Sequence, residues 1–225
     1  MAVSTRPETR WPAGAAVVVV LLLQATLTAR LVPGPALLLP GLEALLLVGL
    51  LIADPNRLTV ESRDLRLPSL ALTGLVAAVN AVALGVLIDR LVVGSGGSGR
   101  QLLASAAGVW LTNVVVFALV WWEVDRGGPL GRSGALDAAA APRQHHPSYP
   151  DLLFPQDTGL GAVAAPGWRP GFVDYLFVSL MTSTAFSPTD TMPLTPRGKL
   201  LMGLQSLVSL LTVGLVAARA VNILR

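Results

Sequence analysis

The chain has 225 residues, of which 53% are hydrophobic and 13% are charged, and its mean hydropathy is +0.66. Soluble domains carry about a quarter charged residues, so this composition excludes an ordinary water-soluble protein and predicts an integral membrane protein with room for five or six spans of ~20 residues. The net charge of +3 is spread over single basic residues, which argues against a nucleic-acid partner, and the absence of cysteine excludes disulfides and thiolate metal sites.

The N-terminal part of the chain predicts a hairpin of two membrane spans. Residues 15–32 form a first apolar run, and Pro33-Gly34-Pro35 breaks it before a second run over 36–53. A polar stretch with cancelling charges follows, and a third apolar run covers 70–88.

A Gly/Ser-rich connector over 94–99 separates the third run from a fourth, 102–122. The fourth run ends in Trp121-Trp122, a pair typical of the membrane–water interface. The polar stretch that follows contains seven prolines up to Pro170, too many for a long helix or strand, and is therefore predicted to be an extramembrane loop.

Near the C-terminus a short apolar segment, 172–186, precedes a last strong span over 198–218. About fifteen residues are too few to cross a bilayer untilted, so the short segment is either a re-entrant helix or a tilted sixth span. The predicted fold class is an all-α polytopic transmembrane helix bundle. Its parts are a four-span bundle (1–123), a proline-rich extramembrane loop (124–170) and a final helix, turn and span (171–225).

Lys and Arg residues near the spans predict the orientation, because they are enriched on the cytoplasmic side. With a cytoplasmic N-terminus and six spans, eleven of the sixteen basic residues lie inside. These eleven are Arg6, Arg10, Arg57, Arg63, Arg66, Arg126, Arg132, Arg143, Arg169, Arg219 and Arg225. If the short segment is re-entrant, Arg197 and Lys199 exchange sides with Arg219 and Arg225. The count then stays eleven to five, so it favours a multi-pass plasma-membrane protein with a cytoplasmic N-terminus in both arrangements.

The end of the short segment carries a recognisable pattern. The residues concerned are Thr184, Ala185, Phe186, Ser187, Pro188, Thr189, Asp190, Pro193, Thr195, Gly198 and Leu200. In this register the chain resembles the pore loop and inner helix of the potassium-channel superfamily, whose pattern is Thr-Thr-Val-Gly-Tyr-Gly-Asp-x-x-Pro-x-Thr-x-x-Gly-x-Leu. The same stretch also resembles one in a group of uncharacterised bacterial multi-span membrane proteins.

The channel resemblance implies that 172–184 is a pore helix and 185–190 the filter position, flanked by the fourth span as outer helix and the last span as inner helix. The chain departs from the family where Ser187 and Thr189 replace the two filter glycines and Pro188 replaces the tyrosine. Glycine lets a filter backbone adopt positive φ, so the resemblance does not extend to potassium selectivity. Pore loops of this family also enter from outside, opposite to the orientation that the basic residues favour.

Glu43 is the only acid well inside a strong predicted span. It follows Pro40-Gly41, where a broken helix could bind a proton or cation, and the alternative is a protonated or hydrogen-bonded Glu that holds helices together. Other polar residues in the spans are predicted to join helices, namely Gln24, Asn80, Asn113, Gln205 and Asn222.

Two functions are compatible with these patterns. The first is an ion-conducting or ion-binding pore-loop protein, a homo-oligomer with a cation as its ligand. Its pathway would be lined or supported by Thr182, Thr184, Ser187, Thr189 and Asp190, with Glu43 as an accessory acid. The second is a non-conducting scaffold whose extramembrane loop binds a partner. The sequence lacks the common catalytic, metal-binding and cofactor-binding motifs, so no enzyme activity, resident metal or cofactor is predicted.

Overall fold

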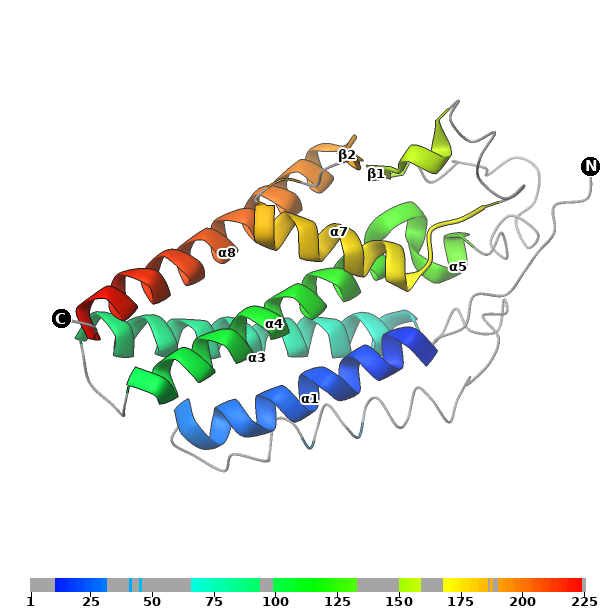
Figure 1. Cartoon of the computed structure of the whole chain (residues 1–225). Coiled ribbons are helices and arrows are strands. Elements are labelled where there is room, and N and C mark those ends of the chain that lie inside the picture. Colours follow the sequence, from blue (N-terminus) through cyan, green and yellow to red (C-terminus); the bar gives the residue numbers. More distant parts are fainter. Residues whose placement is uncertain are drawn as a thin grey trace, which may run out of the picture.

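The computed structural model describes residues 11–31, 41, 45, 66–93, 99–132, 150–158, 168–185, 187 and 190–223. Within them the chain is an all-α helix bundle, as the sequence predicts, with one short strand pair at one end (Figure 1). In chain order the elements are α1 (Trp11–Leu31), α3 (Arg66–Val93), α4 (Gly99–Val124), the 3-10 turn η2 (Asp125–Gly127), α5 (Gly128–Arg132), β1 (Leu152–Leu153), the 3-10 turn η3 (Pro155–Asp157), α7 (Phe172–Ala185), β2 (Met192–Pro193) and α8 (Pro196–Ile223).

Three of these helices are long and apolar enough to cross a membrane by length and composition, over Leu67–Arg90, Leu103–Gly127 and Pro196–Ala218. Two shorter apolar helices cover Trp11–Thr26 and Phe172–Ala185. The chain is therefore a helical membrane protein. Most of the predicted second span, including Glu43, lies outside the described residues, as do 94–98 of the predicted connector, whereas Gly99 already belongs to α4.

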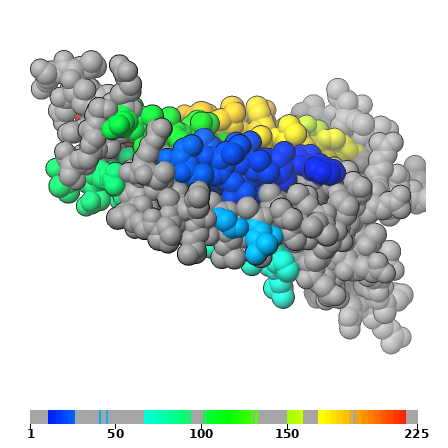
Figure 2. Space-filling model, turned by 90° about the horizontal axis from the view of Figure 1, so that it is seen from below, coloured from blue at the N-terminus to red at the C-terminus, as the bar shows by residue number. Residues whose placement is uncertain are grey.

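Helix α4 is the centre of the bundle. It contacts α1, α3, α7 and α8. Of its apolar stretch 61% is buried inside the protein, whereas only 22% of the apolar stretch of α8 is buried. Its large side chains, Trp121 and Trp122 among them, join those of α1, α3, α7 and β1 in one apolar core. Figure 2 shows α1 along one face of the bundle, with α7 at its edge. The leucines of α8 that face outward suit contact with lipid.

Local sequence explains where α7 and α8 begin. Thr195 caps α8, because its hydroxyl accepts the N–H of Gly198 at 3.0 Å and Pro196 supplies the first helical residue. At α7 the carboxylate of Asp174 accepts the N–H of Gly171 at 2.8 Å, the reciprocal half of a capping box. Both helices therefore have defined first turns.

A tight turn after α4 redirects the chain. Arg126, Gly127 and Gly128 all have positive φ, of 55°, 75° and 76°. A Cβ on Gly128 would lie 2.6 Å from the backbone oxygen of Glu123, so only glycine fits there. The turn leads into α5 and places Asp125 and Arg126 at the end of the bundle.

Candidate functional site

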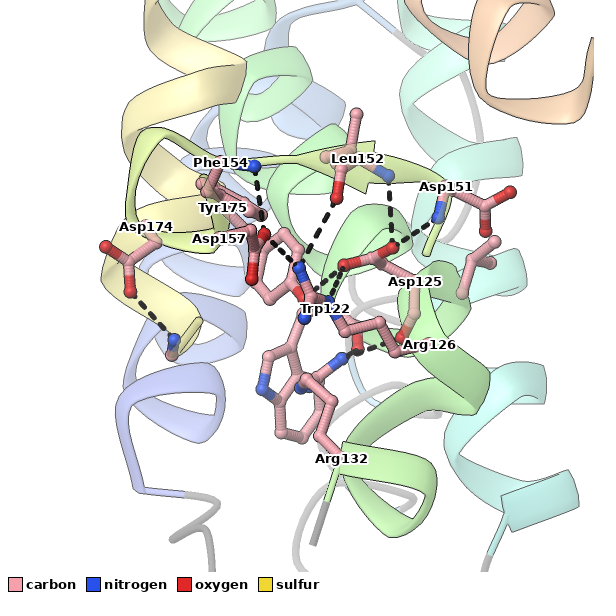
Figure 3. A network of polar contacts seen from close by, with 12 residues as sticks. Trp122, Asp125, Arg126, Arg132, Asp151, Leu152, Phe154, Asp157, Asp174 and Tyr175 are labelled. Atoms are coloured by element: carbon pink, nitrogen blue, oxygen red, sulfur yellow. Dashed lines mark hydrogen bonds and ion pairs between the residues drawn. The ribbon is translucent and has the colours of Figure 1, made fainter. Parts of the chain in front are cut away.

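Asp125 is the central residue of a polar network at the end of α4 (Figure 3). Its carboxylate is fully buried and accepts the backbone N–H groups of Asp151 and Leu152 at 2.7 and 3.2 Å. It also accepts the phenol of Tyr175 at 2.7 Å. One carboxylate thus joins the end of α4, strand β1 and the first turns of α7.

Two arginines complete this side of the network. Arg126 forms an ion pair with Asp157 and donates to the carbonyl of Leu152 at 3.4 Å. Arg132 donates to the carbonyls of Trp122 and Asp125 at 2.8 and 3.0 Å, so it satisfies carbonyls that the end of α4 leaves free.

The guanidinium of Arg132 also lies over two aromatic rings. Its central carbon is 5.0 Å from the ring centroid of Tyr175 and 5.9 Å from that of Trp122, within cation–π range. Burial raises the pKa of the Tyr175 phenol above its ordinary value, because desolvation disfavours the phenolate and Asp125 acts in the same direction, although Arg132 opposes both. Tyr175 therefore remains a neutral donor to Asp125 at physiological pH.

Asp151 ties the start of α8 to the same end of the bundle. Its buried carboxylate accepts the hydroxyl of Thr195 and forms an ion pair with Arg197, and its carbonyl accepts the N–H of Leu194 at 2.8 Å. Arg197 also reaches the carbonyl of Val124 at 3.4 Å.

Strands β1 and β2 add a second connection at this end. They pair antiparallel, with Leu152 opposite Pro193 and Leu153 opposite Met192. We call the whole assembly the polar clasp, defined as Asp125, Arg126, Arg132, Asp151, Asp157, Tyr175, Thr195 and Arg197.

The polar clasp determines how α7 is connected. The end of α4, the first turns of α7 and the first turn of α8 all contact it. Helix α7 therefore runs into the bundle from this end, and the chain has returned to the same end when α8 begins (Figure 1). At ~1.5 Å per residue its 14 residues measure about 21 Å, short of the ~30 Å hydrocarbon core.

A second polar group lies deeper, where α4, α7 and α8 meet. Gln205 donates to the carbonyl and hydroxyl of Ser179 at 2.8 and 2.7 Å and to the hydroxyl of Ser183 at 3.0 Å. It accepts the indole N–H of Trp121 at 3.3 Å, and Ser179 donates to the carbonyl of Val114 at 2.6 Å. Since Gln205 lies nine residues into α8, this layer is about 14 Å from the clasp end at ~1.5 Å per residue. The last turn of α7 thus ends inside the bundle.

The residues predicted to line a pathway fall into different environments. Thr182 is fully buried, whereas Thr184, Ser187 and Asp190 are exposed, and Thr189 lies outside the described residues. The hydroxyl of Thr184 donates to the carbonyl of Leu180 at 2.9 Å in its own helix.

The predicted role of polar residues in joining helices is confirmed for four of them, Gln24, Asn80, Asn113 and Gln205. Gln205 joins α7 and α4 to α8, Asn80 bonds Asn113 at 3.4 Å, and Gln24 bonds the carbonyl of Val76 at 3.3 Å. The side chain of Asn222 lies outside the described residues.

Sequence reasoning missed the polar clasp. Asp125-Arg126 directly after the Trp121-Trp122 pair is a usable signal, since charges at the end of a span are well placed to bind neighbouring segments. Their partners, however, are as distant in sequence as Asp157 and Tyr175. No group of three or more His, Asp or Glu residues suited to a metal ion occurs in the part of the chain that the structure describes.

Comparison of the chain with protein-family models, with curated proteins and with solved structures finds no match. The residues of the chain itself show a helical membrane protein. The short apolar helix α7 begins at the clasp end of the bundle, and α8 begins at the same end.

Proposed function

We propose that the chain is a multi-pass protein of the plasma membrane that forms a cation pathway as a homo-oligomer, with α7 as a re-entrant helix. The observation that carries the proposal is the connection of α7, whose first turns and whose following helix are both bound to the polar clasp. A helix that stops inside the bundle leaves its last carbonyls without intrahelical partners. Lipid cannot satisfy such groups, so they need protein or water around them.

The charge distribution of α7 favours a cation at its inner end. Its carbonyl end carries the negative pole of the helix dipole, and Asp174 stabilises the positive pole at the opposite end. Exposed hydroxyls of Thr184 and Ser187 lie at or just beyond the inner end, and exposed Asp190 lies on the returning chain. A carboxylate at a mouth concentrates cations and supports their passage.

One copy of the chain contributes a single re-entrant helix, which cannot enclose a pathway alone. The outward faces of α7 and α8 carry exposed apolar side chains, including Phe177, Leu204 and Leu207. These faces are available to a second copy as well as to lipid. The similarity of residues 184–200 to a pore loop agrees with this arrangement, and the serine and threonine at the filter-glycine positions argue for a cation pathway without potassium selectivity.

Flux through purified protein in liposomes tests the proposal. Wild-type protein should pass sodium, potassium or protons down an imposed gradient, and Asp190→Asn should lower cation flux. The loss should be larger at low salt, where screening is weakest. Asp89→Asn is the matched control, because Asp89 is an exposed acid near the C-terminal end of α3, which lies at the opposite end of the bundle from the clasp (Figure 1).

The contrary result is equally specific. Wild-type protein that passes none of the three ions, while remaining folded and oriented in the liposomes, rejects the pathway. The non-conducting scaffold then becomes the better interpretation, with the clasp end as the surface for its partner.

A further inference from the structure

Two asparagines meet in the middle of the bundle, one from α3 and one from α4. The Nδ2 of Asn80 donates to the Oδ1 of Asn113 at 3.4 Å, and the two residues are only 4% and 5% exposed. This bond uses one half of each amide. The other halves, Oδ1 of Asn80 and Nδ2 of Asn113, are buried and have no hydrogen-bond partner within the described part of the chain.

A second contact shows that this bond belongs to a continuous seam between α3 and α4. Near the clasp end, the hydroxyl of Ser69 donates to the carboxylate of Glu123. Asn80 follows Ser69 by eleven residues, and Asn113 precedes Glu123 by ten. Nearly equal steps in opposite directions are what two antiparallel helices in contact require. The asparagine pair is therefore a regular level of the seam, about 16 Å from Ser69 at ~1.5 Å per residue.

Apolar clusters close the seam on both sides of the asparagine pair. Toward the clasp, Val76 of α3 and Val116 of α4 belong to the main core. Away from the clasp, Ala83 of α3 and Val109 of α4 belong to a second apolar cluster. Leaving a buried amide donor or acceptor without a partner is costly, so the two unused amide halves need an internal ligand.

The chemistry of the two unused atoms selects the class of ligand. A cation needs acceptors and an anion needs donors, whereas this pair presents one acceptor and one donor. The nearest charged residues along α3 and α4 are Asp89 and Glu123, about 14 and 15 Å from the asparagines at ~1.5 Å per residue. Neither helix therefore supplies a charge to balance an ion. A small neutral molecule that both donates and accepts fits the pair.

We propose that Asn80 and Asn113 bind one ordered water molecule between α3 and α4. The water accepts from Nδ2 of Asn113 and donates to Oδ1 of Asn80, and buried water typically makes about two to four such bonds. Helix α1 brings a third amide close by. Nε2 of Gln24 bonds the carbonyl of Val76 at 3.3 Å, one helical turn before Asn80. The site is built without α7 and does not depend on ion conduction.

A density map of the wild-type protein in lipid nanodiscs, at a resolution that shows ordered water, tests the site directly. A water peak should lie about 2.7–3.2 Å from the amides of both Asn80 and Asn113. Resolved amides with no peak beside them, or amides that bond each other twice, overturn the proposal. The map requires no substitution, so this test does not depend on whether variants fold.

Infrared spectroscopy gives an independent readout of the water. Wild-type membranes should show an O–H stretching band of bound water that shifts in ¹⁸O-labelled water, and Asn80→Leu should abolish it. Thr212→Val is the matched control, because its buried hydroxyl bonds the carbonyl of Val208 at 2.7 Å within its own helix. This control should retain the band. A wild-type spectrum without the band, or a band that persists in Asn80→Leu, overturns the proposal.

Stability should change with the loss of the water. Asn80→Leu and Asn113→Leu should each lower the unfolding midpoint in detergent by about 2–4 °C, because each leaves the other amide with an unmet group. The double variant should lose less than the sum, since the first substitution already releases the water. Midpoints that rise or stay unchanged in both single variants contradict the proposal.

Discussion

The phenol of Tyr175 donates a hydrogen bond of 2.7 Å to the carboxylate of Asp125, fifty positions earlier in the chain. Both side chains are fully buried. The bond joins the start of α7 to the end of α4, while Asp151 and Arg197 join the start of α8 to the same place. These two connections hold α7 in position, because its first turn and the helix that follows it are bound to one end of the bundle.

Stability should fall in alkaline solution because of Tyr175. Its folded-state pKa is raised above the unfolded value of about 10, so the stabilisation is complete below pH ~10 and is lost as pH rises towards the folded pKa. The slope approaches about 1.4 kcal/mol per pH unit, since unfolding releases one proton. Unfolding midpoints between pH 8 and roughly 11.5 measure this. Tyr175→Phe should be less stable than the wild type at pH 8 and should lack this component of the slope, and parallel curves for the two proteins would contradict the prediction.

Gly128→Ala should destabilise the protein by at least about 1–2 kcal/mol, because φ is +76° there and the new Cβ would lie 2.6 Å from the backbone oxygen of Glu123. Gly74→Ala is the matched control. A Cβ on Gly74 meets nothing within 4 Å, and alanine in the interior of α3 should stabilise by about 0.5–1 kcal/mol. Thermal unfolding of both variants in the same detergent should give shifts of opposite sign, and equal shifts would show that the turn after α4 adopts another conformation.

Gln205→Leu should destabilise the contact between α7 and α8. The substitution removes donors to Ser179 and Ser183 and the acceptor for Trp121, at a cost of about 1–2 kcal/mol for hydrogen bonds between membrane helices. Leu204→Ala, at the exposed neighbouring position, should stay within about 0.5 kcal/mol of the wild type. The measurement is the unfolding midpoint, supported by protease sensitivity of the 186–191 segment. An unchanged midpoint in Gln205→Leu would mean that apolar packing alone holds α7.

Cysteine labelling should distinguish a re-entrant α7 from a spanning one. The chain contains no cysteine, so single cysteines can be placed before α7 at exposed Gln156, after it at Met192 and near the far end of α3 at Val92. Gln156 and Met192 should label from the same side of the membrane, and Val92 from the opposite side. Opposite labelling of Gln156 and Met192 would show that α7 crosses the bilayer.

The same experiment decides the orientation. The basic residues favour a cytoplasmic clasp end, so an impermeant reagent should label Val92→Cys and not Gln156→Cys in intact cells. Three basic residues at the clasp end, Arg126, Arg132 and Arg197, have specific partners in the polar clasp. Their position therefore has a structural cause besides the enrichment of basic residues on the cytoplasmic side. Labelling of Gln156→Cys instead would show that these arginines serve the fold and do not report topology.

Several features followed from the sequence because they depend on residues close together in the chain. Long apolar runs predicted α3, α4 and α8 as membrane helices, and the described helices extend a few residues beyond the runs at both ends. The short length of the segment after Pro170 predicted a helix that could be re-entrant. The polar residues within the spans predicted contacts between helices, since an amide in an apolar environment needs a partner.

The tertiary structure alone decided which partners those groups take. Asp125 binds backbone groups and a phenol that lie 26 to 50 positions away, and Gln205 selects Ser179 and Ser183 from all the hydroxyls in the chain. Such choices depend on helix directions and on the turn through Arg126, Gly127 and Gly128, which short-range patterns do not encode. A hydrophobic run determines that a helix leaves water for the membrane or the protein core, because that transfer depends on side-chain composition. The return of the chain to the clasp end after α7 depends on directional bonds between distant residues, and therefore appears only in the folded molecule.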